Sequence, residues 1–275
     1  MRQSIAKWIY TIVSAAIGIL MLLPFLWMLS ASLKRPIEVF EYPIRWIPRE
    51  FMWSNYAEVW LNPYYPFFEF YLSSIKVTGL TVIGTLLVSS LAAYAFAKLN
   101  FFGKNVIFLC YLATLMVPHH VTLVPRFILF HWMDIYNTHW ALFLPATFNI
   151  LGIFLLRQFF MGIPNELLEA AKMDGAGHLK IWYRVVIPLA TPALVSLMIL
   201  SFIWSWNDYI NPLIFISSKS LYTITLGLQA FMGMESVQYN LIMAGAACAS
   251  VPLIIMFLIM QKYFISGIAS GAVKG

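Results

Sequence analysis

The stretch WIYTIVSAAIGILMLLPFLWMLSASL, residues 8–33, contains 26 residues and no Asp, Glu, Lys or Arg. An α-helix needs about 20 apolar residues to cross the hydrocarbon core of a bilayer, so the stretch is long enough for one crossing. A helix also satisfies its own backbone hydrogen bonds, which lipid cannot do. The stretch is too long for a signal-peptide core and has no clear cleavage site, so we predict a retained first span.

Five further stretches show the same pattern. They lack charged residues over 77–97, 105–125, 135–156, 185–207 and 236–261. With their flanks they predict six transmembrane helices, at about residues 8–33, 72–97, 105–125, 137–158, 187–210 and 238–262. The alternating pattern of a membrane β-barrel is absent from the sequence. We therefore predict an all-α fold, a polytopic membrane protein whose residues 1–275 form a single domain.

The composition agrees with a membrane protein. Hydrophobic residues make up 61% of the chain and charged residues 10%, and the mean hydropathy is +0.81. A soluble domain carries roughly 25% charged residues. The net charge of +6 comes from basic residues scattered between apolar runs, which indicates contact with lipid head groups and not with nucleic acid. Cys110 and Cys248 lie in apolar runs and indicate small buried side chains, not a disulfide or a metal site.

The basic residues predict the orientation. With the N-terminus inside, the cytoplasmic segments hold 10 of the 17 basic residues in 56 positions, against 7 in 80 positions outside. The positive-inside rule therefore places both termini in the cytoplasm. It also predicts an outer loop over 34–71, a cytoplasmic loop over 161–186 and a cytoplasmic tail over 263–275.

The predicted outer loop is rich in aromatic residues and proline. Two interpretations stay open: an aromatic belt at the membrane surface, or a docking surface for an extracellular partner. Within the loop, Asn55 followed by Glu58 is typical of a capping box at the start of a short helix.

The predicted cytoplasmic loop gathers charge, with six charged residues among the nineteen from Glu166 to Arg184. Pro164 suits a helix start and Gly175 a helix stop. Each half predicts a short amphipathic helix with one apolar face. The expected apolar residues are Leu167, Leu168 and Ala171 in the first helix, and Leu179, Trp182, Tyr183 and Val186 in the second. These helices would lie on the lipid surface or dock a partner. His178 would bond across that interface or face solvent.

The spacing of this loop resembles a known signature. Glu169-Ala170-Ala171, three residues, Gly175, nine residues and then Val185-x-Ile187-Pro188 is similar to the EAA motif of membrane subunits in binding-protein-dependent ABC importers, which usually ends Ile-x-Leu-Pro. The resemblance implies the type I permease fold and a coupling helix that docks on a cytoplasmic ATPase. It assigns this docking to Glu169, Ala170, Ala171, Asp174 and Gly175.

Two more stretches are similar to the carbohydrate class of these importers: WSWNDYINPLIF at 204–215 and the ending YFISGIASGAVKG. The resemblance implies import of a sugar or oligosaccharide by alternating access, in the bacterial cytoplasmic membrane. The implied partners are a second homologous permease of different sequence, two ATPase subunits that bind ATP and Mg, and an extracellular or periplasmic sugar-binding protein. The chain itself would hold no cofactor, and its tail would touch the ATPase through Gly271, Ala272, Val273, Lys274 and Gly275.

The sequence contains no G-x-x-x-x-G-K-[ST] phosphate-binding loop. We therefore expect a non-catalytic subunit that receives energy from a partner. The run of small residues AGAACAS, 244–250, allows helices to approach closely, either between subunits or within this one.

Polar residues in or beside the predicted spans are candidates for the substrate path, because such groups tend to face a cavity or another helix. They are Asn149, Asn207, Asp208, Asn211, His119 and His120. The two histidines have too few other ligands nearby for a metal site, so we predict none. They would face the path at a broken helix end or pack as a pair.

Two other functions fit the sequence less well. An ion-coupled secondary transporter of a small polar solute would need ionisable groups in mid-span, and the predicted spans have almost none. An intramembrane enzyme built on His119 or His120 would need a nucleophile or a metal set at that depth, and the sequence offers no such set.

Overall fold

The computed structural model describes residues 2–232 and 237–272. Within these residues the chain is helical and contains no β-strand. It forms two compact units. The first contains residues 1–68 and 227–251, and the second contains residues 69–226 and 252–275.

The helices of the first unit are α1 (Arg2–Ser32), η1 (Pro36–Glu38) and α2 (Ser54–Leu61). It shares α3 (Phe67–Lys98), α13 (Ile224–Met232) and α14 (Tyr239–Ala272) with the second unit. The second unit continues with α4 (Lys104–Ala113), η2 (Thr114–Met116), η3 (His119–Thr122), α5 (Leu123–Trp132), α6 (Trp140–Ala146) and α7 (Ile150–Met161). Its remaining elements are α8 (Asn165–Met173), α9 (His178–Ile181), η4 (Trp182–Val186), α10 (Ile187–Leu189), α11 (Thr191–Trp206), α12 (Ile210–Phe215) and η5 (Lys219–Leu221).

Four segments of the described chain are long and apolar enough to cross a membrane: Lys7–Ser32, Phe67–Lys98, Trp140–Met161 and Tyr239–Gln261. Two bent helix pairs pass the same test, and counting each pair as one span gives six. The pairs are Lys104–Met116 with His119–Trp132, bent by 94°, and His178–Leu189 with Thr191–Trp206, bent by 82°. The predicted all-α membrane fold is confirmed.

The bend in the third predicted span, 105–125, has a local cause. Val117 is extended, with φ −82° and ψ 116°, and Pro118 follows it. Proline lacks an N–H and disfavours the helical conformation of the residue before it, so the helix ends there and restarts at His119. A broken helix end beside His119 and His120 is one of the two arrangements predicted from the sequence, and the break lies directly before them.

The first unit contains a buried amide network. The Asn55 amide donates to the Ser32 and Lys34 carbonyl oxygens at 2.8 and 2.9 Å, and its oxygen accepts from Asn240 at 3.1 Å. Asn55 lies inside α2, whose N-cap is Trp53 and lacks a side-chain cap. The predicted capping box was therefore wrong. The Asn55 amide instead donates to carbonyl oxygens at and just after the end of α1, because these carbonyls have no hydrogen-bond donor within the helix.

The small residues at the start of α14 pack within the first unit. A Cβ added to Gly245 would lie 2.7 Å from Leu228 Cδ2 and 3.3 Å from Phe67 Cε2. Ala244 and Ala247 are buried. Of the two interpretations of the AGAACAS run, the structure supports packing within the subunit.

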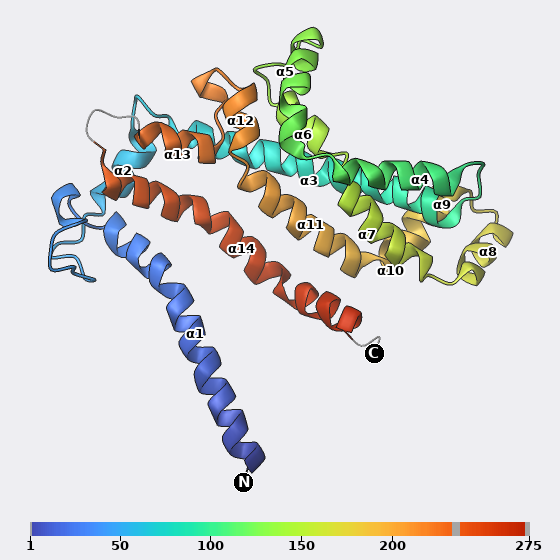
Figure 1. Ribbon diagram of the computed structural model, residues 1–275, viewed down its shortest axis with the longest axis horizontal. Helices are drawn as coiled ribbons and strands as arrows, with labels where there is room; N and C mark the ends of the chain where they lie inside the picture. Colours follow the sequence, from blue (N-terminus) through green and yellow to red (C-terminus); the bar gives the residue numbers. More distant parts are fainter. Residues whose placement is uncertain (1, 233–236, 273–275) are drawn as a thin grey trace. The chain divides into compact units, whose positions relative to one another are not determined.

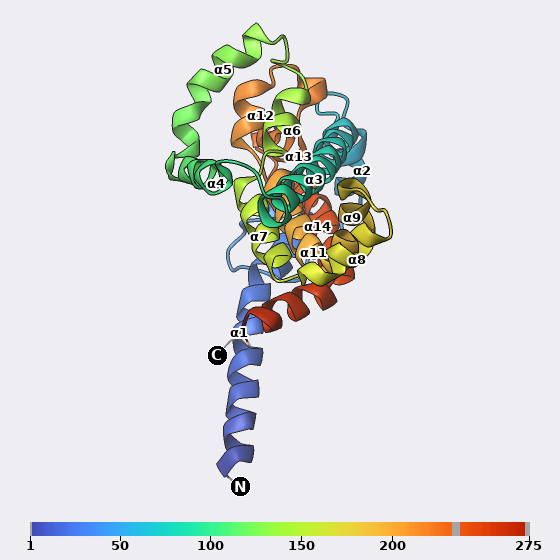
Figure 2. The same cartoon turned by 90° about the vertical axis from the view of Figure 1, so that its right-hand side faces the viewer.

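In the second unit α3, α7 and α11 lie side by side, in both views (Figures 1 and 2). They meet at Gly152, where an added Cβ would lie 2.8 Å from Leu197 Cδ1 and 3.0 Å from Ser89 Oγ. The same three helices also contribute to a buried apolar cluster, which includes Leu156, Phe160 and Ile181. The cluster joins the three long helices to the loop 161–186.

The close approach of α3 to α6 gives a stability prediction. A Cβ on Gly84 would lie 2.3 Å from Thr147 Cγ2, and the Thr147 hydroxyl is bonded to the Leu144 carbonyl at 2.7 Å, so this side chain cannot easily turn away. We expect Gly84→Ala to destabilise the protein by about 1–3 kcal/mol, as overpacking does. Gly79→Ala on the same helix meets nothing within 4 Å and should be neutral or slightly stabilising. Thermal unfolding in detergent measures both, and equal midpoints would contradict the packing.

Candidate functional site

The predicted cytoplasmic loop, 161–186, contains α8 and α9 at one end of the second unit (Figure 1). The helix α8 begins after Pro164 and ends at Met173, as predicted. Gly175 has φ +74° and its N–H donates to the Lys172 carbonyl at 2.9 Å. Glycine adopts this left-handed conformation without steric cost, which is why the helix stops here.

One face of α8 is buried and the other is open. Leu168 belongs to the apolar cluster and Ala171 packs against it. Glu169, Ala170, Asp174 and Gly175 are exposed. Glu169 makes no hydrogen bond or ion pair with another described residue, so its carboxylate is available to a partner. Four of the five residues that the sequence singles out thus lie on the outer side of the loop, while Ala171 is half-buried.

The end of α3 fixes the loop in place. Lys98 Nζ donates to the Ile163 carbonyl oxygen at 2.6 Å and to Asn165 Oδ1 at 2.8 Å, at the start of α8. Tyr94 Oη lies 3.2 Å from His178 Nδ1, at the start of α9. Each helix of the loop is therefore tied to the same transmembrane helix. These contacts could not be predicted from the sequence, because Lys98 and Tyr94 lie more than 60 positions before their partners.

The second half of the loop differs from the prediction. Leu179, Trp182, Tyr183 and Val186 were expected to share one apolar face, but Leu179 and Tyr183 are 73% and 66% exposed whereas Val186 is buried. Ile181, which that prediction did not include, is buried in the same apolar cluster as Val186. Residues 182–186 form a π-helical turn, which places positions five apart on one face. The 3.6-residue period used for the prediction fails across such a turn.

The loop 161–186 carries exposed apolar side chains beside its charges. Leu167, Met173, Leu179 and Tyr183 are all exposed, and Met173 reaches 89%. An apolar surface of this kind on a polar loop is typical of a protein or membrane contact.

A cavity of about 730 Å³ lies within the second unit, and we name it the α3–α11 cavity. Its volume is in the range of small-molecule sites. Its polar lining residues are Thr81, Thr85, His119, Asn149, Ser201, Ser205, Asp208, Asn211 and Thr223. Its aromatic lining residues are Phe148 and Trp204.

Four of the six candidates for the substrate path line this cavity: His119, Asn149, Asp208 and Asn211. Asn207 and His120 are exposed and do not line it. The sequence did not single out the hydroxyl groups, because Ser and Thr are common in helices and often bond their own backbone.

The polar residues of the cavity also hold its walls in shape. Asn149 caps α7, and its Oδ1 accepts from the Gly152 N–H at 2.8 Å. Asp208 accepts from the Asn211 amide at 2.7 Å, and Arg126 donates to Asn211 Oδ1 at 3.2 Å. The Arg126 guanidinium lies over the Phe215 ring, 5.3 Å from its centroid. Asn211 thus connects the broken third span to the start of α12.

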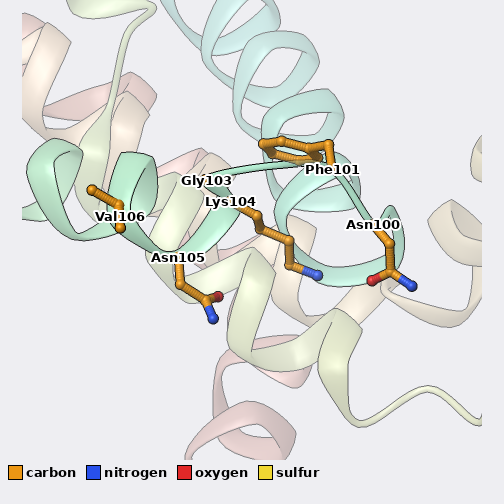
Figure 3. Close-up of a pocket in the computed structure, with 6 residues that line it drawn as sticks. All are labelled: Asn100, Phe101, Gly103, Lys104, Asn105 and Val106. Carbon is orange, nitrogen blue, oxygen red and sulfur yellow. The ribbon is translucent and has the colours of Figure 1, made fainter.

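No group of three or more His, Cys, Asp or Glu side chains suited to a metal ion occurs among the residues that the structure describes. A smaller hollow of about 390 Å³ lies on the turn between α3 and α4, lined by Asn100, Phe101 and residues 103–106 (Figure 3). Lys104 Nζ in this turn donates to the Leu99 carbonyl at 2.9 Å. The hollow contains none of the predicted site residues.

The opposite end of the second unit carries a titratable contact. His139 Nε2 lies 3.1 Å from the Leu221 carbonyl oxygen, which ties the start of α6 to η5. Burial lowers the pKa of His139; the Leu221 contact opposes this, and Lys76 lowers the pKa further.

The burial of His139 predicts a pH dependence of stability. The folded chain holds His139 with a pKa below the unfolded value of about 6.5, so the unfolded chain binds more protons between the two values. The stabilisation is complete above about pH 6.5 and is lost as the pH falls through the lower folded pKa. We expect the unfolding temperature to drop on acidification from pH 7.5 to 5.0, and to drop less in His139→Gln. An equal drop in both proteins would contradict the assignment.

Comparisons with known proteins agree with this architecture. Residues 85–270 match the family described as "Binding-protein-dependent transport system inner membrane component". The probable ABC transporter permease protein YurM of Bacillus subtilis (strain 168) is 36% identical over 258 residues, 92% of this chain and 83% of YurM. The arabinooligosaccharides transport system permease protein AraQ of Halalkalibacterium halodurans is 32% identical over 275 residues, 98% of each chain.

A chain in a crystal structure of a bacterial ABC transporter involved in alginate import has the same fold, with a TM-score of 0.79. It is 24% identical, and the match covers 94% of this chain and 98% of the other. A family of this kind sets aside both the ion-coupled transporter and the intramembrane enzyme. The chain belongs to the family of binding-protein-dependent transport system inner membrane components, and it is a non-catalytic, multi-pass permease subunit of an ABC importer.

Proposed function

We propose that this chain forms one half of the translocation path of a sugar importer. The substrate is a sugar or an oligosaccharide, delivered to the outer face by a binding protein. The cytoplasmic loop 161–186 docks on an ATPase subunit, which binds ATP and Mg and drives alternating access. AraQ, a relative over 98% of the chain, is named for the transport of arabinooligosaccharides, which supports a carbohydrate substrate.

The structure of the cytoplasmic loop is the observation that supports a role in coupling to the ATPase. Four of its five proposed docking residues are exposed, while Lys98 and Tyr94 tie its two helices to α3. The helix α3 also lines the α3–α11 cavity through Thr81 and Thr85. A movement of the loop therefore reaches the cavity through one rigid helix. Binding of ATP can drive transport in this way only if the ATPase favours one of the two loop positions over the other.

The complete importer contains more chains than this one. We propose a second homologous permease of different sequence, which completes the path, and two ATPase subunits below the pair. The tail from Gly271 to Gly275 contacts the ATPase in this arrangement. Gly271 and Ala272 lie at the end of α14, whereas Val273, Lys274 and Gly275 lie outside the described residues.

The test is import by the complete transporter in proteoliposomes. Radiolabelled arabinotriose and raffinose serve as probes, with ATP inside the vesicles and the binding protein outside. We expect accumulation of at least one probe that depends on ATP, on the ATPase subunits and on the binding protein. Accumulation driven by an ion gradient without the ATPase would refute the proposal.

A further inference from the structure

The residues that follow α1 fold back beside its last turns (Figure 1). Ser30 Oγ donates to the Trp46 carbonyl oxygen, and the Trp27 and Trp46 rings meet edge to face with 5.6 Å between their centroids. Lys34 Nζ donates to the Arg45 carbonyl oxygen at 2.5 Å and lies 4.2 Å from the centroid of the Trp27 ring. These contacts hold the chain after α1 level with the end of that helix.

The length of the span sets the depth of this segment, residues 35–53, which we name the collar. The span Lys7–Ser32 has 26 residues, which make about 39 Å of helix. The hydrocarbon core is about 30 Å thick, so a centred span extends roughly 4–5 Å beyond it at each end. Trp27 lies about 7.5 Å before the end of the span. Trp46, which packs against Trp27, therefore lies at the boundary between hydrocarbon and head groups, on the outer side in the predicted orientation.

The backbone of the collar suits the same depth. Its only regular element is η1, Pro36–Glu38, so most of its N–H and C=O groups have no helical partner. Hydrocarbon offers no hydrogen bonds to such groups, whereas the head-group region and its water do. The collar therefore fits the membrane surface and not a deeper position.

The exposed side chains of the collar are mostly aromatic or aliphatic. Tyr42 is 91% exposed and Ile47 is 74% exposed, and Phe40, Ile44 and Phe51 are each more than half exposed. Apolar groups of this size are unfavourable in water. Aromatic rings are favourable at the membrane surface, where the ring contacts acyl chains and a polar edge contacts head groups. The side chains thus match the depth that the span length gives.

The charges of the collar fit a phospholipid surface. Two of its three carboxylates are paired with arginine, in Arg35–Glu50 and Arg49–Glu41, and the third is half-buried. Arg45 is exposed, and its side chain has no ion pair or hydrogen bond with another described residue. Its carbonyl is held at the end of α1, so its side chain starts at the level of the head groups. A guanidinium binds a phosphate group through two parallel hydrogen bonds.

We propose that the collar is a membrane-surface contact. Its exposed aromatic and aliphatic side chains lie among the head groups and upper acyl chains of the outer leaflet, and Arg45 binds a lipid phosphate. Continuity with α1 favours lipid over a protein partner, because α1 is a membrane span and none of the residues in its apolar window is buried. The inference concerns the first unit alone and does not depend on which solute is transported.

The first test measures the depth of the collar in a bilayer. The complete transporter is placed in nanodiscs of phosphatidylcholine and phosphatidylglycerol, and one cysteine carries a bimane label. The sites are Tyr42→Cys and Ile47→Cys, in a background with Cys110→Ala and Cys248→Ala and with the other subunits free of cysteine. Lipids with a nitroxide at acyl carbon 5 should quench both labels, because this carbon lies just below the head groups.

Two controls bracket this depth. Leu20→Cys lies in the middle of α1 and is exposed, so a nitroxide at acyl carbon 12 should quench its label most. Lys172→Cys is exposed in the polar loop 161–186, and lipid nitroxides should quench its label least. We expect the carbon-5 lipid to quench the two collar labels at least threefold more strongly than the Lys172→Cys label.

The second test concerns Arg45. Near an anionic surface one basic residue contributes about 1 kcal/mol, which corresponds to about a fivefold local enrichment of anionic lipid. We therefore expect nitroxide-labelled phosphatidylglycerol to quench the Tyr42→Cys label about fivefold more than the same amount of labelled phosphatidylcholine. Arg45→Gln should bring this ratio close to one, and Arg45→Lys should keep most of it. The unfolding midpoint should stay unchanged, because the Arg45 side chain is exposed.

Three results would overturn the proposal. The first is quenching of both collar labels by lipid nitroxides at the level of the Lys172→Cys control. The second is shielding of these labels from aqueous iodide only when the binding protein is added, which would make the collar a docking surface for that protein. The third, an equal lipid ratio in the parent and in Arg45→Gln, would overturn the phosphate contact.

Discussion

Glu169→Lys is expected to release the ATPase subunits from the purified transporter and to abolish ATP-driven import. The carboxylate is exposed on α8 and makes no hydrogen bond or ion pair with another described residue, so the substitution should leave the fold intact. A hydrogen bond from a partner to a charged group contributes about 1.5–3 kcal/mol, and reversing the charge adds repulsion to this loss. Each 1.4 kcal/mol is a tenfold change in affinity, so we expect the affinity for the ATPase to fall about a hundredfold.

The measurement is retention of the ATPase subunits on the affinity-purified permease, together with import in proteoliposomes. Glu58→Lys is the matched control: it makes the same charge reversal on an exposed residue of the short helix α2, in the predicted outer loop. We expect this control to retain the ATPase fully. Retention of the ATPase by Glu169→Lys at the control level would show that the docking surface lies elsewhere.

Lys98→Met is expected to uncouple the transporter: the ATPase stays bound and hydrolyses ATP, but the hydrolysis no longer drives import. Lys98 Nζ is bonded to the Ile163 carbonyl and to Asn165 Oδ1, and methionine removes both bonds while keeping most of the side-chain volume. Each bond to a charged donor contributes about 1.5–3 kcal/mol, so the start of α8 should move independently of α3. The exposed docking residues are not changed.

The diagnostic quantity is the number of ATP molecules hydrolysed per sugar imported. We expect this ratio to rise about tenfold or more in Lys98→Met, since a coupling loss of 1.4 kcal/mol corresponds to a factor of ten. Lys98→Arg keeps the charged donor and should recover much of the coupling. If the ratio in Lys98→Met matches the parent protein, α3 does not transmit the movement of the loop. A loss of folded protein would be seen in the unfolding midpoint and separated from uncoupling.

Between these two variants, the docking surface and its mechanical support are tested separately. Glu169 belongs to a motif that can be recognised in the sequence because its spacing is local, within one helix and its turn. The support from Lys98 and Tyr94 cannot be recognised in this way. It depends on how the end of α3 packs against a loop more than 60 positions later.

The same division holds for the fold. Apolar stretches of about 20 residues must be helices in lipid, so the number and order of the membrane segments follow from the sequence. A broken helix end after Pro118 could be predicted from the proline, but the size of the bend, 94°, could not, because the run of uncharged residues continues across it. The π-turn at 182–186 has no such local marker, and it decides which residues of the second cytoplasmic helix are buried.

The sequence by itself thus determined the helical membrane fold and the position of the two short helices in the loop 161–186, because each depends on local charge, hydropathy and spacing. Only the tertiary structure decided which side chains share a site. Thr81 and Ser201 lie 120 positions apart and resemble any other small polar residue in an apolar helix. They line one cavity because α3 and α11 lie side by side with α7, and no sequence motif marks the close fit of the three helices at Gly152.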